Sequence, residues 1–292
     1  MTVRRSLGAA TAALALLSAC ARPGDGAGAA PDVSSPAPPT APATADGLVL
    51  RMTRQGGFVP VETVPGRVPE VSVYADGRVV TPGPQIQIYP GPAVPNLEVT
   101  DIGAAAAAEL VRRAEAAGVR TGADFGQPGV ADAPDTRIDV ITGGGPQSVT
   151  VPALGQAAPD DPRLTPPQRD ARAKLTTFTE ELRALGDRGE AKPYRPAAVA
   201  ALAQPYSAPD DGLPARPLPV AWPGPPLPGP ALSPGVKLGC VTATGDEAAA
   251  VLAAAAEANQ NTPWTSGAER FRVTFRPLLP DETGCADLRN AR

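Results

Sequence analysis

The residues of this 292-residue chain that could do chemistry are its acids and its three cysteines, because it contains no histidine. The absence of histidine excludes Ser–His–Asp and Cys–His hydrolases, the usual zinc sites, haem ligation and histidine phosphotransfer. A glycine-rich phosphate loop of the P-loop or dinucleotide-binding type is also missing from the sequence. Carboxylate chemistry is what remains.

Asp132 and Asp135 are the best-placed pair of acids for catalysis. Two such carboxylates can cleave a glycosidic bond, one as acid and the other as base or nucleophile. The same aspartates flank Pro134 and can equally form Asx-turns. Sugar-cleaving sites usually contain aromatic platforms, and aromatic residues make up only 4% of this chain. We therefore expect turns here, with a carboxylate-based hydrolase as the alternative.

Three pairs of adjacent acids could also hold calcium through their oxygens. None has the spacing of a known calcium loop, so we expect solvated turns, no metal site and no cofactor. The pairs are Asp160–Asp161, Asp210–Asp211 and Asp281–Glu282.

Residues 1–19 have the three parts of a secretory signal: basic residues at Arg4 and Arg5, an apolar run from Leu7 to Leu17, and a small-residue exit. The apolar run is too short for a permanent membrane helix. The Arg4–Arg5 pair leaves twin-arginine export open, although the rest of that motif is absent and the general secretory route fits better.

The exit tetrapeptide Leu17-Ser18-Ala19-Cys20 resembles the lipobox of bacterial lipoproteins. The resemblance implies cleavage before Cys20 and a diacylglycerol on its thiol. Two acyl chains hold a protein stably on a bilayer. We therefore expect a lipid-anchored protein on the extracytoplasmic face of the bacterial cell membrane. An ordinary cleaved signal with an accidental cysteine is the alternative.

Cys240 and Cys285 remain once Cys20 carries lipid, and two cysteines outside the cell normally pair. A disulfide closing a loop of about 45 residues would stabilise the fold by roughly 4 kcal/mol on the chain-entropy model. A redox-active pair is the alternative, but the sequence has no CxxC spacing.

The composition limits the partners. The net charge is −4 and the chain has no basic stripe, which argues against nucleic acid. The expected partners are the membrane, through Cys20, and an envelope protein, a wall polymer or a small ligand.

The expected fold class is α+β, with antiparallel hairpins packed against about three main helices. The chain is divided into a signal peptide (1–19), a lipid-anchored Pro/Ala/Gly-rich tether (20–46), an α+β subdomain (47–204), a Pro-rich linker (205–235) and a C-terminal β-α-β subdomain with the disulfide (236–292).

Local patterns predict individual elements. Asp76-Gly77 predicts a tight hairpin turn, and the alternation of Gln85–Tyr89 predicts a strand. Thr165 followed by Pro166 and Gln168 predicts a capped helix to about Leu185. A short helical patch is expected around 197–203.

Val99–Ala116 and Val241–Ala258 align without a gap at an offset of 142 residues. Both segments read as a strand, a glycine turn and a helix. The body could therefore contain two related β-α-β units, although an alanine-rich chain produces much of this matching by chance.

The body, residues 47–285, resembles lipoproteins and secreted proteins of high-GC Gram-positive bacteria. The resemblance implies location and shape, and no activity. It is carried by Gly56–Pro60, Tyr74–Val79, Ile88–Pro92, Gly129–Pro134, Pro263-Trp264 and Phe275–Glu282.

These observations favour an exported, lipid-anchored, non-catalytic binding or accessory protein. A carboxylate-based envelope hydrolase is one alternative, and a solute-binding lipoprotein is the other.

Overall fold

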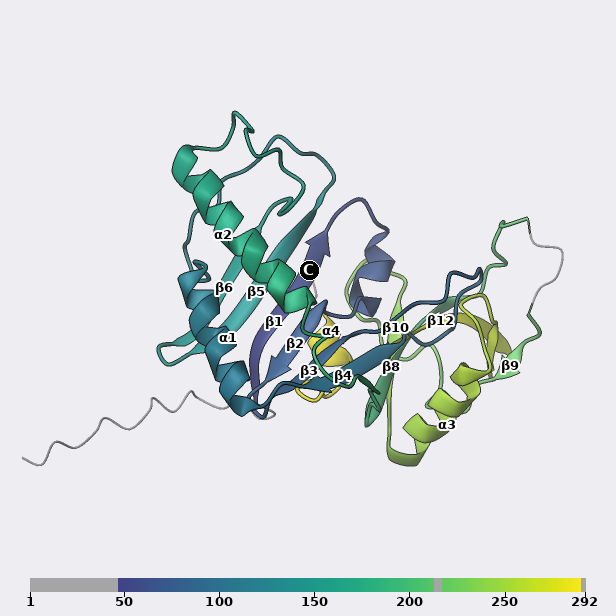
Figure 1. Ribbon diagram of the computed structural model, residues 1–292. Helices are drawn as coiled ribbons and strands as arrows, with labels where there is room; N and C mark the ends of the chain where they lie inside the picture. Colours follow the sequence, from purple (N-terminus) through teal and green to yellow (C-terminus); the bar gives the residue numbers. More distant parts are fainter. Residues whose placement is uncertain (1–46, 213–216, 290–292) are drawn as a thin grey trace, which may run out of the picture. The chain divides into compact units, whose positions relative to one another are not determined.

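The computed structural model describes residues 47–212 and 217–289 (Figure 1). The predicted signal peptide, Cys20 and the tether lie outside these ranges. Two antiparallel-rich sheets and three longer helices make up the described part, which confirms the predicted α+β class. All described residues belong to one compact unit.

The first sheet has seven strands in the order β6-β5-β1-β2-β3-β4-β7, and every neighbouring pair is antiparallel. Its strands are β1 (Leu48–Gly56), β2 (Val71–Tyr74), β3 (Arg78–Pro82), β4 (Leu97–Asp101), β5 (Pro134–Thr142), β6 (Gly145–Val151) and β7 (Lys192–Pro193). A short 3-10 helix, η1 (Val61–Gly66), follows β1.

Turn chemistry explains the two hairpins of this sheet. The predicted Asp76-Gly77 turn joins β2 to β3, and Gly77 has the positive φ of 99° that favours glycine. A second hairpin joins β5 to β6 and turns at Gly143–Gly145.

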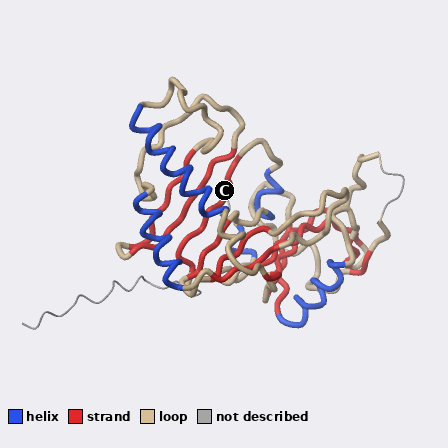
Figure 2. The backbone as a smooth tube through the Cα atoms, viewed as in Figure 1, coloured by secondary structure: helices blue, strands red, loops and turns tan. Residues whose placement is uncertain are grey.

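Two helices, α1 (Ala104–Ala116) and α2 (Pro166–Arg183), cover one face of the first sheet, as Figure 2 shows. The predicted capping box is present at the start of α2, where Thr165 and Gln168 bond reciprocally. The apolar stripe of α2 meets the inward residues of β1 and β5, so the core contains Leu50, Met52, Ile138, Leu175 and Leu182.

The second sheet has five strands in the order β10-β8-β12-β11-β9, with only β11 and β9 parallel. Its elements are β8 (Ala198–Pro205), β9 (Val220–Ala221), β10 (Gly239–Thr244), α3 (Gly245–Ala256), β11 (Trp264–Ser266) and β12 (Glu269–Pro277). Its core combines Trp264, Phe271 and Phe275 with small residues of β8 and α3.

The expected helix around 197–203 is wrong: this segment is strand β8. Alanine favours helix intrinsically, but β8 lies between β10 and β12 and uses both edges for pairing. Its small side chains are almost fully buried there. Because β8 pairs with the later strands, the change from the first sheet to the second falls between β7 and β8, earlier than the expected boundary at 204.

The expected strand at Gln85–Tyr89 is also wrong. This segment forms no ladder and is fully exposed, with Ile86 67% accessible. Prolines at 84 and 90 flank it, and Gly91 and Ala93 bond instead to the loop that follows α3. The alternation of polar and apolar residues was therefore not sufficient to form a strand here, because a strand also needs a pairing partner.

The two aligned segments share a local turn. Gly103 precedes α1 and Gly245 begins α3, and both have positive φ, of 78° and 54°. Their packing differs, since α1 lies on β1 and β5 whereas α3 lies on β10 and β8.

The predicted Cys240–Cys285 disulfide is present. It ties the short helix α4 (Cys285–Leu288) to β10, and Thr242 Oγ1 accepts a hydrogen bond from the Cys285 amide. The chain after β12 is thus attached to the second sheet. No helix within 47–212 and 217–289 combines the length and the apolar composition that crossing a bilayer requires.

Candidate binding pocket

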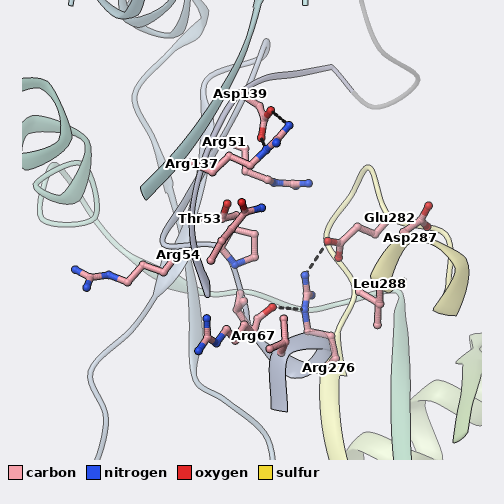
Figure 3. Close-up of a pocket in the computed structure, with 14 residues that line it drawn as sticks. Arg51, Thr53, Arg54, Arg67, Arg137, Asp139, Arg276, Glu282, Asp287 and Leu288 are labelled. Carbon is pink, nitrogen blue, oxygen red and sulfur yellow. Dashed lines mark hydrogen bonds and ion pairs between the residues drawn. The ribbon is translucent and has the colours of Figure 1, made fainter. Parts of the chain in front are cut away.

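The most distinctive cavity is an arginine-lined pocket of about 190 Å³, drawn in Figure 3. It lies against the face of the first sheet that α1 and α2 leave uncovered. Four parts of the chain form it: β1, the η1 region, β5 and the segment from β12 to α4. The charged and polar residues that line it are Arg51, Thr53, Arg54, Gln55, Arg67, Arg137, Asp139, Arg276, Glu282 and Asp287.

Strand alternation explains the floor of the pocket. Residues 50 and 52 of β1 point into the helix-covered core, so Arg51 and Thr53 point to the opposite face. The β1–β5 register places Asp139 opposite Arg51 and Arg137 opposite Thr53. Arg137 and Asp139 also form a two-point ion pair, with N–O distances of 2.8 and 2.6 Å.

Arg51 is the centre of a hydrogen-bond network. Its Nε donates to Ser72 Oγ (3.1 Å) and its Nη2 donates to Asp281 Oδ1 (2.7 Å), which also accepts from the Tyr74 hydroxyl (2.8 Å). Burial alone would lower the pKa of Arg51, but the charge and hydrogen bond of Asp281 outweigh it and raise that pKa. Burial, and then Asp281, raise the pKa of Tyr74. Arg51 therefore stays charged and Tyr74 stays neutral.

The opposite wall is held by Arg276, which is only 2% exposed. Its guanidinium donates to Glu282 Oε1 (2.7 Å), to the Arg67 carbonyl oxygen (3.1 Å) and to the Pro277 carbonyl oxygen. Glu282 also accepts from the Leu279 amide at 2.8 Å. This one arginine thus fixes the turn after β12 against the η1 region.

The acids of the wall are already engaged as hydrogen-bond acceptors. Asp281 and Glu282 each accept from an arginine, and Asp287 accepts from the amides of Thr283 and Gly284 at the start of α4. The hydrogen bond from the Thr283 amide stabilises the charged carboxylate and lowers the pKa of Asp287.

Two donors of the pocket have no acid as a partner and could bind a ligand. Within the described residues, the Thr53 hydroxyl oxygen is buried and has no hydrogen-bond partner. The Arg67 guanidinium donates to the Gly56 carbonyl oxygen (3.0 Å) and, in the same described ranges, has no carboxylate partner. A buried polar atom without a partner is uncommon in proteins, and an unplaced ligand or water is one explanation.

Figure 3 shows how these side chains lie. Arg276 and Glu282 face each other across one side of the pocket, and the Arg137–Asp139 pair lies at the other end. Arg54 points away from this space and pairs with Glu70.

The two aspartates proposed as catalytic candidates are not in this pocket. Asp132 is exposed in the loop before β5 and has a positive φ of 58°, and Asp135 lies in β5 opposite Gln55. Neither lines this pocket or the three other main cavities of the described residues. In the same ranges, no group of three or more acids and cysteines is placed to hold a metal ion.

The residues of the pocket carried only a weak signal in the sequence. Arg51, Thr53 and Gln55 alternate with apolar residues, as do Arg137 and Asp139, which is typical of a polar sheet face. Their meeting depends on pairing between β1 and β5, and the wall comes from residues about 230 positions later.

Comparisons of the chain with protein-family models, with curated proteins and with solved structures gave no match. The fold and the site therefore define the class: an α+β protein with an arginine-lined polar pocket that is rich in hydrogen-bond donors.

Proposed function

We propose that this protein is an exported, lipid-anchored envelope protein whose body binds a small carboxylate-bearing ligand without converting it. The signal, the Leu17–Cys20 tetrapeptide and the tether support export and anchoring through Cys20. The observation that carries the binding role is the unpartnered Thr53 hydroxyl beside a guanidinium-rich lining.

The lining selects the ligand class. Four of the five lining arginines are already paired with acids, two of which, Glu70 and Asp281, lie outside the lining. Among the described residues Arg67 is the lining guanidinium without a carboxylate partner, so it offers a ligand an unpaired positive charge. Arginine binds carboxylates through paired N–H donors, and Thr53 and Arg67 add donors that point to no acid. The volume of about 190 Å³ lies below the range of drug-sized sites, so the ligand, or the part of it that enters, is small.

A hydrolase remains the second candidate, and one observation favours it: Glu282 and Asp281 are acids of low exposure at the pocket wall. Both accept hydrogen bonds from arginines, however, which is the arrangement of structural ion pairs. A solute-binding lipoprotein would use the same pocket to deliver its ligand to a membrane partner.

The anchoring proposal is tested by cell fractionation. The native chain should be found with the membrane, and the Cys20→Ala form should be released or accumulate unprocessed. A fully processed Cys20→Ala protein that stays on the membrane would contradict the anchor.

The binding proposal is tested by calorimetric titration of the full chain carrying Cys20→Ala. Acetate and glycine are the probes, and methylammonium is the probe without a carboxylate. Arg67→Gln should weaken acetate binding about tenfold or more, because the charged guanidinium that donates to the ligand carboxylate is lost. Thr53→Val should weaken it less.

Arg120→Gln is the matched control, since Arg120 is exposed and lies outside the pocket. It should leave acetate binding unchanged. The binding proposal fails if neither acetate nor glycine binds saturably, or if methylammonium binds as well as acetate.

A further inference from the structure

A second cavity, of about 620 Å³, differs in character from the arginine-lined pocket. One helix face forms its first side: Gly245, Ala248, Ala249 and Leu252 of α3 recur with the spacing of a single helical stripe. Its other side comes from the segment around β4 and from Tyr194–Ala197 between β7 and β8. We refer to this cavity as the α3 groove.

The groove is open because α3 is built from small residues. The adjoining face, with Val251 and Ala255, packs on the second sheet together with Ala248, and all three residues are buried. On the groove side, glycine and alanine leave space that larger side chains would fill. Leu252 and Leu97 then present aliphatic surface to the cavity, with Val94 beside them. An apolar cavity of this size is within the range of small-molecule sites.

The charge of the groove is simple. Arg195 is the one charged residue among the described residues that line it, and no acid does. Unlike the arginines of the other pocket, Arg195 makes no ion pair or side-chain hydrogen bond within 47–212 and 217–289. The Tyr194 hydroxyl is committed to the Leu278 carbonyl oxygen at 2.8 Å. Asp246 and Glu247, in the first turn of α3, are exposed and are not part of the lining.

We propose that the α3 groove binds an anionic amphiphile with a single aliphatic chain, such as a fatty acid. The chain lies against Leu97, Ala249 and Leu252, and the carboxylate binds Arg195 at the rim. An apolar ligand without charge would leave Arg195 unused, and a polar anion without a chain would leave the aliphatic surface in water. The combination therefore selects a molecule that has both parts.

This site is separate from the arginine-lined pocket and does not depend on the function proposed for it. The two cavities share no lining residue. Changes at Arg195 and Arg67 consequently separate the two proposals.

The test uses the full chain carrying Cys20→Ala, purified without detergent, and calorimetric titration below the micelle concentration of each probe. Dodecanoate is the main probe, with dodecanol for the chain alone. Arg195→Gln should weaken dodecanoate binding about tenfold and leave dodecanol binding unchanged. Ala249→Phe should abolish the binding of both, because the ring occupies the space of the chain.

Controls separate this site from loss of folding and from the other pocket. Arg120→Gln and Arg67→Gln should bind dodecanoate as the parent does. Thermal melting of Ala249→Phe should show a folded protein, and if it does not, Ala249→Leu replaces it.

Three results would overturn the proposal. One is the absence of saturable dodecanoate binding by the folded parent. Another is equal weakening of dodecanol and dodecanoate by Arg195→Gln, since Arg195 would then not contact the carboxylate. Binding of a two-chain phospholipid in place of dodecanoate would also reject the single-chain ligand.

Discussion

Arg51 Nη2 and Asp281 Oδ1 lie 2.7 Å apart, although 230 residues separate them in the chain. Both side chains are 16% exposed, so the ion pair is largely withdrawn from water. It connects β1 of the first sheet to the segment that the disulfide attaches to the second sheet. The stability of the arginine-lined pocket therefore depends on a contact between residues near the two ends of the described chain.

Asp281→Ala should lower the free energy of unfolding by about 2–4 kcal/mol, because Arg51 and Tyr74 both lose their shared acceptor in a low-water environment. Urea denaturation measures the change. Glu109→Ala is the matched control: it removes the exposed Arg112–Glu109 pair and should cost about 0–1 kcal/mol. Equal costs would show that the Arg51 pair has no special weight.

The Cys240–Cys285 bond closes a loop with a sequence separation of 45 residues. Replacing both cysteines by alanine should lower the free energy of unfolding by roughly 4 kcal/mol on the chain-entropy model. Acetate binding should weaken as well, since α4 carries part of the pocket wall. A free-thiol count on the oxidised Cys20→Ala protein gives an independent check, and two titratable thiols would contradict the disulfide.

The raised pKa of Tyr194 predicts that the protein loses stability at alkaline pH. Burial, followed by the nearby charge of Glu282, raises its pKa from 10 to about 12. A raised pKa means that the folded state holds its proton longer than the unfolded state, so this contribution is complete below pH 10 and is lost as the pH rises through 12. Each pH unit in that window should lower the free energy of unfolding by less than about 1.4 kcal/mol, because Tyr194 is partly exposed and solvent weakens the effect.

Denaturant melts between pH 9 and pH 12 measure this slope. Tyr194→Phe should flatten it, and Tyr206→Phe should not. Absorbance at alkaline pH gives a second readout, since Tyr194→Phe should remove a tyrosine that ionises above the ordinary pKa of its side chain. An unchanged slope in Tyr194→Phe would contradict the assignment.

Gly77 and Gly122 form a matched pair for testing close backbone packing. Both have positive φ, of 99° and 84°, so alanine is strained at either position. A methyl group at Gly77 would lie 2.6 Å from the Gly103 Cα atom, whereas at Gly122 it would meet nothing within 4 Å. Gly122→Ala should therefore cost about 1 kcal/mol, and Gly77→Ala clearly more. Thermal melting of the two variants measures the difference, and equal costs would contradict the close approach.

Local rules in the sequence were sufficient where neighbours along the chain decide the outcome. The Asp76-Gly77 turn needs only its own backbone angles, and the Thr165 capping box needs only residues three positions away. The disulfide also followed from the sequence, because two cysteines remain once Cys20 is set aside, and the proposed export would expose them to oxidising surroundings.

Local rules failed where a distant partner decides. The alanine-rich segment of β8 became a strand because β10 and β12 supplied hydrogen bonds on both edges. Gln85–Tyr89 has strand alternation and stayed irregular, since no strand of the described residues pairs with it. Intrinsic preferences of well under 1 kcal/mol per residue are smaller than the effect of burial and pairing.

By itself, the sequence determined the α+β class, the hairpin turns, the capped helix and the cysteine pair, and it supports the expected lipid anchor at Cys20. Only the tertiary structure brought Arg51, Arg276 and Glu282 to one pocket, and only it opened the α3 groove beside Arg195. The reason is physical. A turn or a cap is set by bonds within a few residues, whereas a pocket is set by the register of strands and by contacts across more than 200 residues.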